Sequence, residues 1–283
     1  MIEKSTKIAI IGLGLLGGSY AQGLSLAGYQ VKGLDIDEQA VRQAGKNGWI
    51  VAGGNDPSLI SDCDIVISAL YPRDFVSWVN SNQQYLRTGA ILSDVTGIKR
   101  MVISEINAIL RSDVEFIACH PMAGRESRGI AYADSSQFEN SNFIIVPTEE
   151  NSQRAIDTAK DIASILKFGR ISVLDAERHD QIIGFVSQLC HVIAVSLMNI
   201  SDDPMLIDYT GDSFRDLTRI ANINEDLWPQ LFIANKDNLS REIDAPTEQL
   251  NQLKEYIVEE DVSAMRELMI RVSERRKKFD RRK

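Results

Sequence analysis

A glycine-rich turn near the start of the chain has residue types and a spacing that could do chemistry. It reads G-x-G-x-x-G and lies between an apolar run at 8–11 and a helix-like segment ending near Tyr29. The first glycine allows a tight bend, the second admits a pyrophosphate to the backbone, and the third lets helix and strand pack closely. The helix N-terminus then faces the phosphates. We predict a dinucleotide-binding turn with cofactor contacts from Gly12, Gly14, Leu15, Leu16 and Gly17.

A carboxylate ends the next apolar run. Asp35 is the last residue of the run 31–35 and follows the third glycine, Gly17, by 18 residues. This is near the spacing of about 20 residues at which an acid binds the adenosine ribose of a dinucleotide. A negative charge there repels the 2′-phosphate of NADP, so the predicted cofactor is NAD. Lys32 and Asp37 lie beside it and leave the choice between NAD and NADP open.

Two polar segments follow later apolar runs. Residues 93–99 contain Thr96, and residues 119–126 contain His120 and Glu126. Ligands of open α/β sheets bind outside the carboxyl ends of the strands, so we expect His120 to project into the crevice beside the nicotinamide. Histidine titrates near neutral pH and suits general base catalysis. We therefore predict His120 as a catalytic residue, with a role as a helix or loop cap as the alternative.

The elements that must position these residues follow an alternating pattern. Segments with helical spacing, such as 38–47 and 100–110, separate apolar runs at 8–11, 31–34, 65–69, 90–93, 114–118 and 143–146. Runs this apolar predict a mainly parallel sheet covered by helices on both faces. The expected fold is α/β, a Rossmann-like doubly wound domain, extended by a helix at 152–166 and a strand at 171–174.

From residue 176 the strand pattern stops. Residues 188–200 are apolar nearly all round, as in a helix buried in a helical domain or at a subunit interface. Further helices are expected at 213–222, 226–244, 247–258 and about 260–279. We predict a Rossmann domain over 1–175 and an all-helical domain over 176–283 that binds substrate and forms a homodimer.

Composition narrows the function classes. The chain has 283 residues, 44% of them hydrophobic and 25% charged, which is typical of globular proteins. A net charge of −9 argues against nucleic-acid or membrane partners, and we interpret the basic run at 275–283 as a solvated helix end. Three scattered cysteines predict neither disulfides nor a metal site. Glycines and polar residues interrupt the uncharged stretch 8–31, and a strongly basic secretory signal is missing, so we expect a cytoplasmic protein.

Five segments follow one another in a consistent order over nearly the entire chain: GLGLLGGS, DVTGIK, HPMAGRE, SQLCH and FRDLTRIANINEDLW. In these segments the chain resembles the prephenate dehydrogenases of tyrosine biosynthesis, with arogenate dehydrogenases as close relatives. The resemblance implies NAD-dependent oxidative decarboxylation of prephenate to 4-hydroxyphenylpyruvate, with arogenate as the alternative substrate. It also implies that His120 hydrogen-bonds the ring hydroxyl and draws its proton.

The resemblance further implies substrate-binding residues. Arg219 matches an arginine that binds a carboxylate, although a surface ion pair with Asp216 or Glu225 is the alternative. Glu126 matches a residue proposed to gate the pocket. His191 matches a family histidine near the cofactor and substrate, and Trp228 could form a wall of the pocket, with a place in the core as the alternative for each.

Two positions depart from the family pattern. Gly97 stands where the family has serine, and Thr96 could supply the hydroxyl instead. Gln188 replaces the first histidine of the S-H-x-x-H pattern and is expected to contact substrate in its place.

Two other functions compete with this interpretation. A β-hydroxyacid dehydrogenase would need a catalytic lysine in the helical domain, and the sequence has none between Lys167 and Lys236. A non-catalytic NAD-sensing protein would keep the glycine turn and Asp35 without needing His120 or Arg219.

Overall fold

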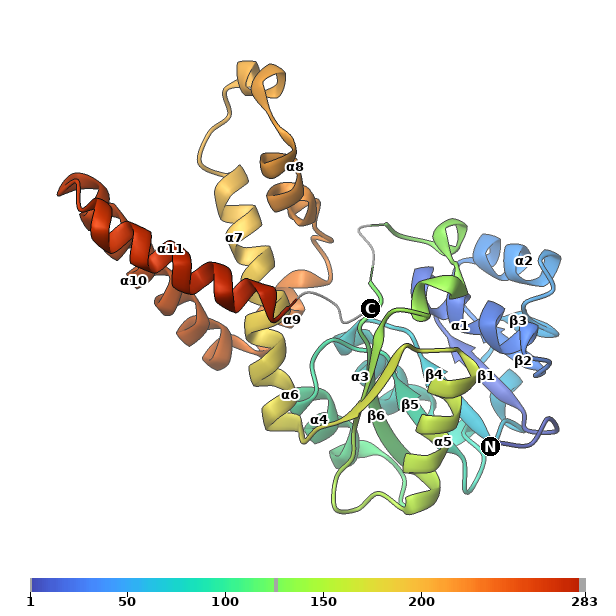
Figure 1. Ribbon diagram of the computed structural model, residues 1–283. Coiled ribbons are helices and arrows are strands. Elements are labelled where there is room, and N and C mark those ends of the chain that lie inside the picture. Colours follow the sequence, from blue (N-terminus) through green and yellow to red (C-terminus); the bar gives the residue numbers. More distant parts are fainter. Residues whose placement is uncertain (1, 125–126, 280–283) are drawn as a thin grey trace. The chain divides into compact units, whose positions relative to one another are not determined.

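The computed structural model describes residues 2–124 and 127–279. Its sheet (Figure 1) is formed by β1 (Ile8–Ile11), β2 (Val31–Leu34), β3 (Ala52–Gly54), β4 (Ile65–Ser68), β5 (Ile91–Asp94), β6 (Glu115–Pro121), β7 (Asn142–Val146) and β8 (Arg170–Val173). The α-helices are α1 (Leu15–Leu26), α2 (Glu38–Lys46), α3 (Pro72–Asn82), α4 (Arg100–Ile109), α5 (Gln153–Ile165), α6 (Ala176–Ile183), α7 (Leu189–Met198), α8 (Asp212–Thr218), α9 (Trp228–Ala234), α10 (Lys236–Val258) and α11 (Val262–Lys277).

The strands form one sheet in the order β3-β2-β1-β4-β5-β6-β7-β8. Neighbouring strands are parallel except β6 and β7, which are antiparallel. The strand order changes direction between β1 and β4, which is where open α/β sheets bind ligands. The predicted doubly wound, mainly parallel sheet is confirmed.

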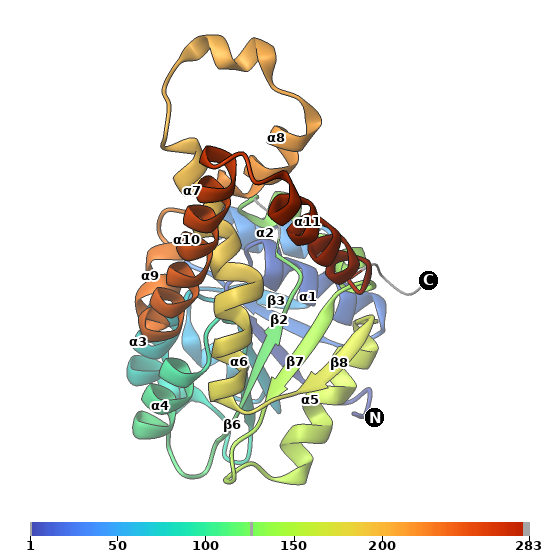
Figure 2. The ribbon, with the colours of Figure 1, turned by 60° about the vertical axis from the view of Figure 1, so that its left-hand side comes forward.

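Each face of the sheet has its own hydrophobic core. Successive side chains of a strand point to opposite faces. Ile8 and Ile10 of β1 belong to the core that includes α1 and α5, whereas Ala9 and Ile11 belong to the core that includes α3 and α4. Figure 2 shows these helix pairs on the two sides of the sheet. Burial on both faces explains why the strands read as continuous apolar runs.

Two features of the sheet differ from the sequence prediction. Strand β3 was not predicted, because its sequence Ala-Gly-Gly lacks an apolar run. Its Gly53 packs against Ile50 so closely that a Cβ would lie 2.6 Å from that side chain. His120 belongs to β6 itself and pairs with Ile144 of β7, rather than lying in a loop after the strand.

The helical region also differs in detail. A π-helical turn (Gly184–Gln188) joins α6 to α7, so the predicted helix at 188–200 begins inside a longer run. The predicted break between 244 and 247 is wrong, because Pro246 lies inside α10. The break comes instead at Asn235, between α9 and α10.

The uncharged stretch 8–31 forms β1, α1 and the start of β2, as expected of a folded domain. The continuous helix Ala176–Met198 is long and apolar enough to cross a membrane, and 28% of its apolar window is buried. Core helices of soluble proteins can meet the same criteria. The chain divides into two compact units, 1–235 and 236–283. The domain boundary expected near residue 175 stays a prediction.

Candidate active site

A cavity of about 760 Å³ lies beyond the carboxyl ends of β1, β4, β5 and β6. Its volume is in the range of small-molecule sites. It brings together eight of the residues singled out in the sequence, which are Gly14, Leu15, Leu16, Thr96, His120, Gln188, His191 and Trp228. These residues come from segments more than 200 positions apart, so the cavity is a property of the fold.

The glycine turn has the geometry that a dinucleotide requires. Gly12 has φ +85°, and a Cβ on Gly17 would lie only 1.7 Å from the carbonyl oxygen of Gly12. A Cβ on Gly14 would meet no heavy atom within 4 Å among the described residues, and Gly14 lines the cavity. The first N–H groups of α1 are free of intrahelical partners and suit an anion. This turn fits the pyrophosphate of a nicotinamide cofactor.

Asp35 holds this turn against the end of β2. One carboxylate oxygen accepts the backbone N–H of Leu13 at 2.6 Å, and the other accepts that of Asp37 at 2.8 Å. The side chain is half-buried and stands beside the turn, where the ribose of a bound dinucleotide would lie.

His120 reaches the cavity from β6 and is backed by a second histidine. Its Nδ1 lies 2.9 Å from Nε2 of His179, and the two rings meet edge to face. His120 is half-buried, whereas His179 on α6 is fully buried. Burial, then the neighbouring His179 and Lys99, lower the pKa of His120 well below its usual value. His120 is therefore neutral near pH 7 and able to accept a proton.

Asp180 connects His179 to the start of α4. One oxygen of its buried carboxylate lies 2.7 Å from Nδ1 of His179 and accepts the N–H of Lys99 at 2.9 Å. The other accepts the N–H of Arg100 at 2.9 Å. Burial lowers the pKa of His179 despite the opposing effect of Asp180.

A buried ion pair lies under the loop between β5 and α4. The Nζ of Lys99 is 2.5 Å from Asp94 and 3.1 Å from the hydroxyl of Thr96, and all three side chains are buried. The second oxygen of Asp94 accepts the N–H of Cys119, next to His120. The Thr96 hydroxyl also contacts Asp94 and the carbonyl of Ile98. These contacts occupy the hydroxyl predicted to replace the family serine.

The opposite wall of the cavity comes from α7 and α9. His191 donates its Nδ1 proton to the carbonyl of Ser187 at 3.0 Å, and its ring lies 3.6 Å from that of Trp228. Gln188 lines the cavity, but its amide is engaged by α9. It donates to the carbonyl of Leu231 at 3.1 Å and accepts from Asn235 at 2.8 Å.

Two of the predicted substrate-binding residues are not placed in the cavity. Arg219 is exposed, and within the described chain its neighbours Ile220 and Asn222 line the cavity while Arg219 does not. Glu126 lies outside the described residues. At the rim, Arg128 pairs with Glu225, which was one alternative partner of Arg219.

Sequence reasoning missed His179, Asp180 and the Asp94–Lys99 pair. His179 is one of only three histidines and stands beside an aspartate, which was the available signal. Its distance from His120 in sequence hid the contact. Within the ranges 2–124 and 127–279, no group of three His, Cys, Asp or Glu side chains is placed to hold a metal ion.

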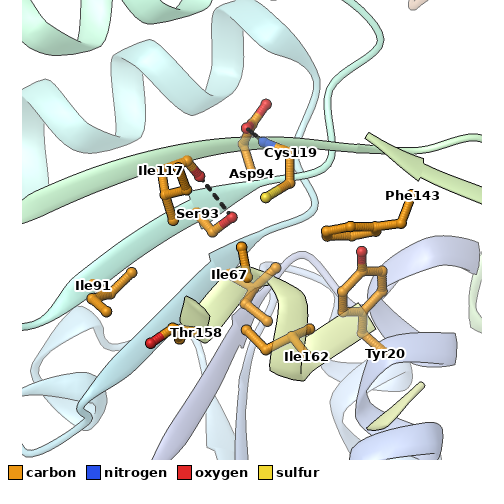
Figure 3. A pocket seen from close by; sticks show the side chains of 11 residues that line it. Tyr20, Ile67, Ile91, Ser93, Asp94, Ile117, Cys119, Phe143, Thr158 and Ile162 are labelled. Atoms are coloured by element: carbon orange, nitrogen blue, oxygen red, sulfur yellow. Dashed lines mark hydrogen bonds between the residues drawn. The ribbon is translucent and has the colours of Figure 1, made fainter. Parts of the chain in front are cut away.

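A smaller cavity of about 10 Å³ lies on the face of the sheet that α1 and α5 cover, next to β5 and β6 (Figure 3). Tyr20 of α1 directs its hydroxyl toward it, beside Phe143 and Cys119. This hydroxyl is buried and lacks a hydrogen-bond partner among the described atoms. Burial raises the pKa of Tyr20 well above its usual value. The cavity is too small for a substrate.

Comparison with known proteins identifies the family. The profile described as prephenate dehydrogenase, nucleotide-binding domain, matches residues 21–170, and the one described as prephenate dehydrogenase, dimerization domain, matches residues 175–271. Prephenate dehydrogenase of Bacillus subtilis is 27% identical over 273 residues, which span 92% of this chain and 72% of that protein. Cyclohexadienyl dehydrogenase of Zymomonas mobilis is 26% identical over 268 residues, spanning 90% of this chain and 89% of that protein.

A solved structure agrees with these matches. Prephenate dehydrogenase from A. aeolicus, in complex with hydroxyphenyl propionate and NAD+, superposes with a TM-score of 0.89 at 27% identity. The superposition covers 97% of this chain and 98% of that one. The chain therefore belongs to the prephenate dehydrogenase family, a family of oxidoreductases of tyrosine biosynthesis with a nicotinamide-binding Rossmann fold.

Proposed function

We propose that the protein is an NAD-dependent prephenate dehydrogenase, which converts prephenate to 4-hydroxyphenylpyruvate. The observation that supports this most is the shared cavity of Gly14 and His120. A proton acceptor thus faces the same space as the dinucleotide turn. NAD, when bound, accepts the hydride that leaves the ring carbon bearing the hydroxyl.

In this proposal His120 performs the proton transfer. It accepts the hydroxyl proton as that carbon becomes a carbonyl, which its lowered pKa permits because it is neutral beforehand. The ring then loses carbon dioxide, and the electron pair of the broken carbon–carbon bond makes the ring an aromatic phenolate. The phenolate oxygen takes the proton back from His120, which gives the hydroxyl group of 4-hydroxyphenylpyruvate. Aromatisation supplies most of the driving force. The protein has mainly to orient the substrate and polarise one oxygen. Thr96, predicted as a second catalytic residue, acts indirectly in this proposal. Its hydroxyl contacts the buried ion pair of Asp94 and Lys99, and Asp94 accepts the N–H of Cys119, next to His120.

Asp35 supports NAD over NADP. Both of its oxygens already accept backbone N–H groups, so the carboxylate is fixed beside the turn. A fixed negative charge repels a 2′-phosphate. We therefore expect a lower Michaelis constant for NAD than for NADP.

The substrate dianion needs cationic and donor groups. We propose Arg219 as the group that binds its carboxylates, His191 as a residue that contacts the substrate, Trp228 as a wall of the site, and Glu126 as a gate at its mouth. Gln188 shapes the site through its bonds to α9 rather than through a free amide. Arg219→Gln tests the arginine: we expect a Michaelis constant for prephenate raised about tenfold or more, with little change in NAD binding.

We also propose a cytoplasmic homodimer formed through residues 176–283, the predicted substrate-binding and dimerisation domain. The description of the profile over 175–271 supports this. So does the exposed apolar surface of α7 and α8, formed by Ile193, Val195, Met198, Phe214 and Leu217. Light scattering that gives the monomer mass at assay concentrations would contradict the dimer.

A single assay tests the proposed function. NAD reduction is followed with prephenate and, separately, with arogenate, which differ only in a side-chain keto or amino group. We expect turnover with prephenate. Turnover with arogenate alone would make arogenate, and not prephenate, the proposed substrate. The similar protein of Zymomonas mobilis is named cyclohexadienyl dehydrogenase and not prephenate dehydrogenase. Tight NAD binding without turnover of either would favour an NAD-sensing protein.

A further inference from the structure

A chain of hydrogen bonds leads from the cavity into the protein behind His120. Nδ1 of His120 lies 2.9 Å from Nε2 of His179, and Nδ1 of His179 lies 2.7 Å from Oδ1 of Asp180. His179 and Asp180 are fully buried, and His120 lines the cavity. A buried chain of this kind can fix which nitrogen of each ring bears its proton.

Asp180 sets the direction of the chain because it acts only as an acceptor. Its two oxygens accept the backbone N–H groups of Lys99 and Arg100, each at 2.9 Å. These groups lie at the N-terminus of α4, where the helix dipole favours a negative charge. An ionised carboxylate has no proton to donate. The proton between Asp180 and His179 therefore belongs to Nδ1 of His179.

The remaining proton positions follow from this one. A neutral histidine has a single N–H, so Nε2 of His179 has a lone pair and must accept. Nδ1 of His120 must then donate, which leaves the lone pair of His120 on Nε2. That atom faces the cavity, since a Cβ built on the cavity-lining Gly97 would lie 3.8 Å from it.

The charges around the two rings are compatible with this neutral arrangement. Lys99 acts on both histidines, and Asp94 and Asp180 act on His179. Lys99 forms its own ion pair with Asp94, so its charge is balanced locally and not by a histidine. The charge of Lys99 therefore does not require either histidine to change from its neutral form.

We propose that His179, held by Asp180, is a positioning residue that keeps His120 as the tautomer with its basic lone pair on Nε2. The inference rests on the proposed function only in that His120 is the base. The tautomer itself is a property of the free protein.

The first test is nitrogen NMR of the full chain with labelled imidazoles. The three histidines are assigned with single variants. We expect His120 and His179 each to have a protonated Nδ1 and an unprotonated Nε2 near pH 7.5. A proton on Nε2 of His120 would overturn the inference. This measurement needs no turnover, so it stands or falls independently of the proposed activity.

The second test compares His179→Leu with His179→Gln. Glutamine can accept from His120 through its carbonyl and donate to Asp180 through its amide, whereas leucine can do neither. We expect kcat to fall roughly 100-fold in the leucine variant and less than about tenfold in the glutamine variant, with the Michaelis constant for prephenate little changed.

Equal kcat values in the two variants would reduce His179 to a packing role and overturn the inference. If the leucine variant does not fold, the glutamine variant and the NMR spectrum of the unaltered protein still decide. If the unaltered protein turns over neither prephenate nor arogenate, the proposed function fails while the tautomer is judged by NMR alone.

Discussion

Gly14 of the turn after β1 and His120 of β6, which pairs with the buried His179, line one cavity, but the glycine turn and the histidine pair are built in opposite ways. The turn uses backbone N–H groups and three glycines, which have no side chains, within the six consecutive residues 12–17. The pair uses buried charged and polar side chains from β6 and α6, together with the N-terminus of α4. The turn is a local motif, whereas the pair exists only when distant segments pack together. Substitutions in the two regions should therefore fail in different ways.

The largest effect is expected in the histidine region. His120→Asn keeps a polar side chain of similar reach but removes a group able to take up the proton. We expect kcat to fall about 1,000-fold while the dissociation constant of NAD changes less than about twofold. Steady-state kinetics and NAD titration by calorimetry measure the two quantities. Unchanged kcat would remove His120 from the chemistry.

In the turn, Gly17→Ala and Gly14→Ala form a matched pair. A Cβ at position 17 would meet the carbonyl oxygen of Gly12 at 1.7 Å, so we expect the free energy of unfolding to fall by about 3 kcal/mol or more. A Cβ at position 14 points into open space, so stability should hold while NAD affinity falls at least about tenfold. Denaturant unfolding and NAD titration separate the two. Equal stability losses would contradict this division.

The histidine region should also give the protein a pH-dependent stability. Burial lowers the pKa of His120 and His179 in the folded state below the ordinary value of about 6.5. As the pH falls below 6.5 the unfolded chain binds protons first, so the free energy of unfolding decreases. The decrease continues until the pH passes the lowered folded-state pKa values. Urea unfolding between pH 8 and pH 5 measures it, and His179→Gln should weaken the dependence. A stability that rises on acidification would contradict the neutral pair.

The smallest effect concerns Tyr20, on the sheet face behind the histidine region. Tyr20→Phe removes a buried hydroxyl without a described partner, so we expect the free energy of unfolding to rise by about 1 kcal/mol. Tyr29→Phe is the control, because its hydroxyl donates to the carbonyl of Ile2 at 3.0 Å and its removal should destabilise by a similar amount. A loss of stability in the Tyr20 variant would mean that its hydroxyl does have a partner.

Sequence reasoning succeeded where the physical cause is local. Strands buried on both faces must be apolar along their length, which is why β1, β2, β4 and β5 were predicted within one residue of their ends. Strand β3 was missed because its Gly53 is required by close packing on Ile50 and the strand has no apolar run. The end of β6 was misplaced because His120 pairs with a later strand that no local pattern reveals.

The sequence by itself determined the Rossmann fold, the dinucleotide turn, Asp35 beside it and the family, because each depends on short-range sterics or on motifs in fixed order. The tertiary structure alone decided three sets of hydrogen bonds. His120 is hydrogen-bonded to His179, which is hydrogen-bonded to Asp180. The hydroxyl of Thr96 contacts Asp94 and Lys99, and the amide of Gln188 donates to a carbonyl of α9. Hydrogen bonds of buried polar groups require partners within about 3 Å. Which distant residues come that close depends on how the elements pack, and a one-dimensional pattern does not contain that information.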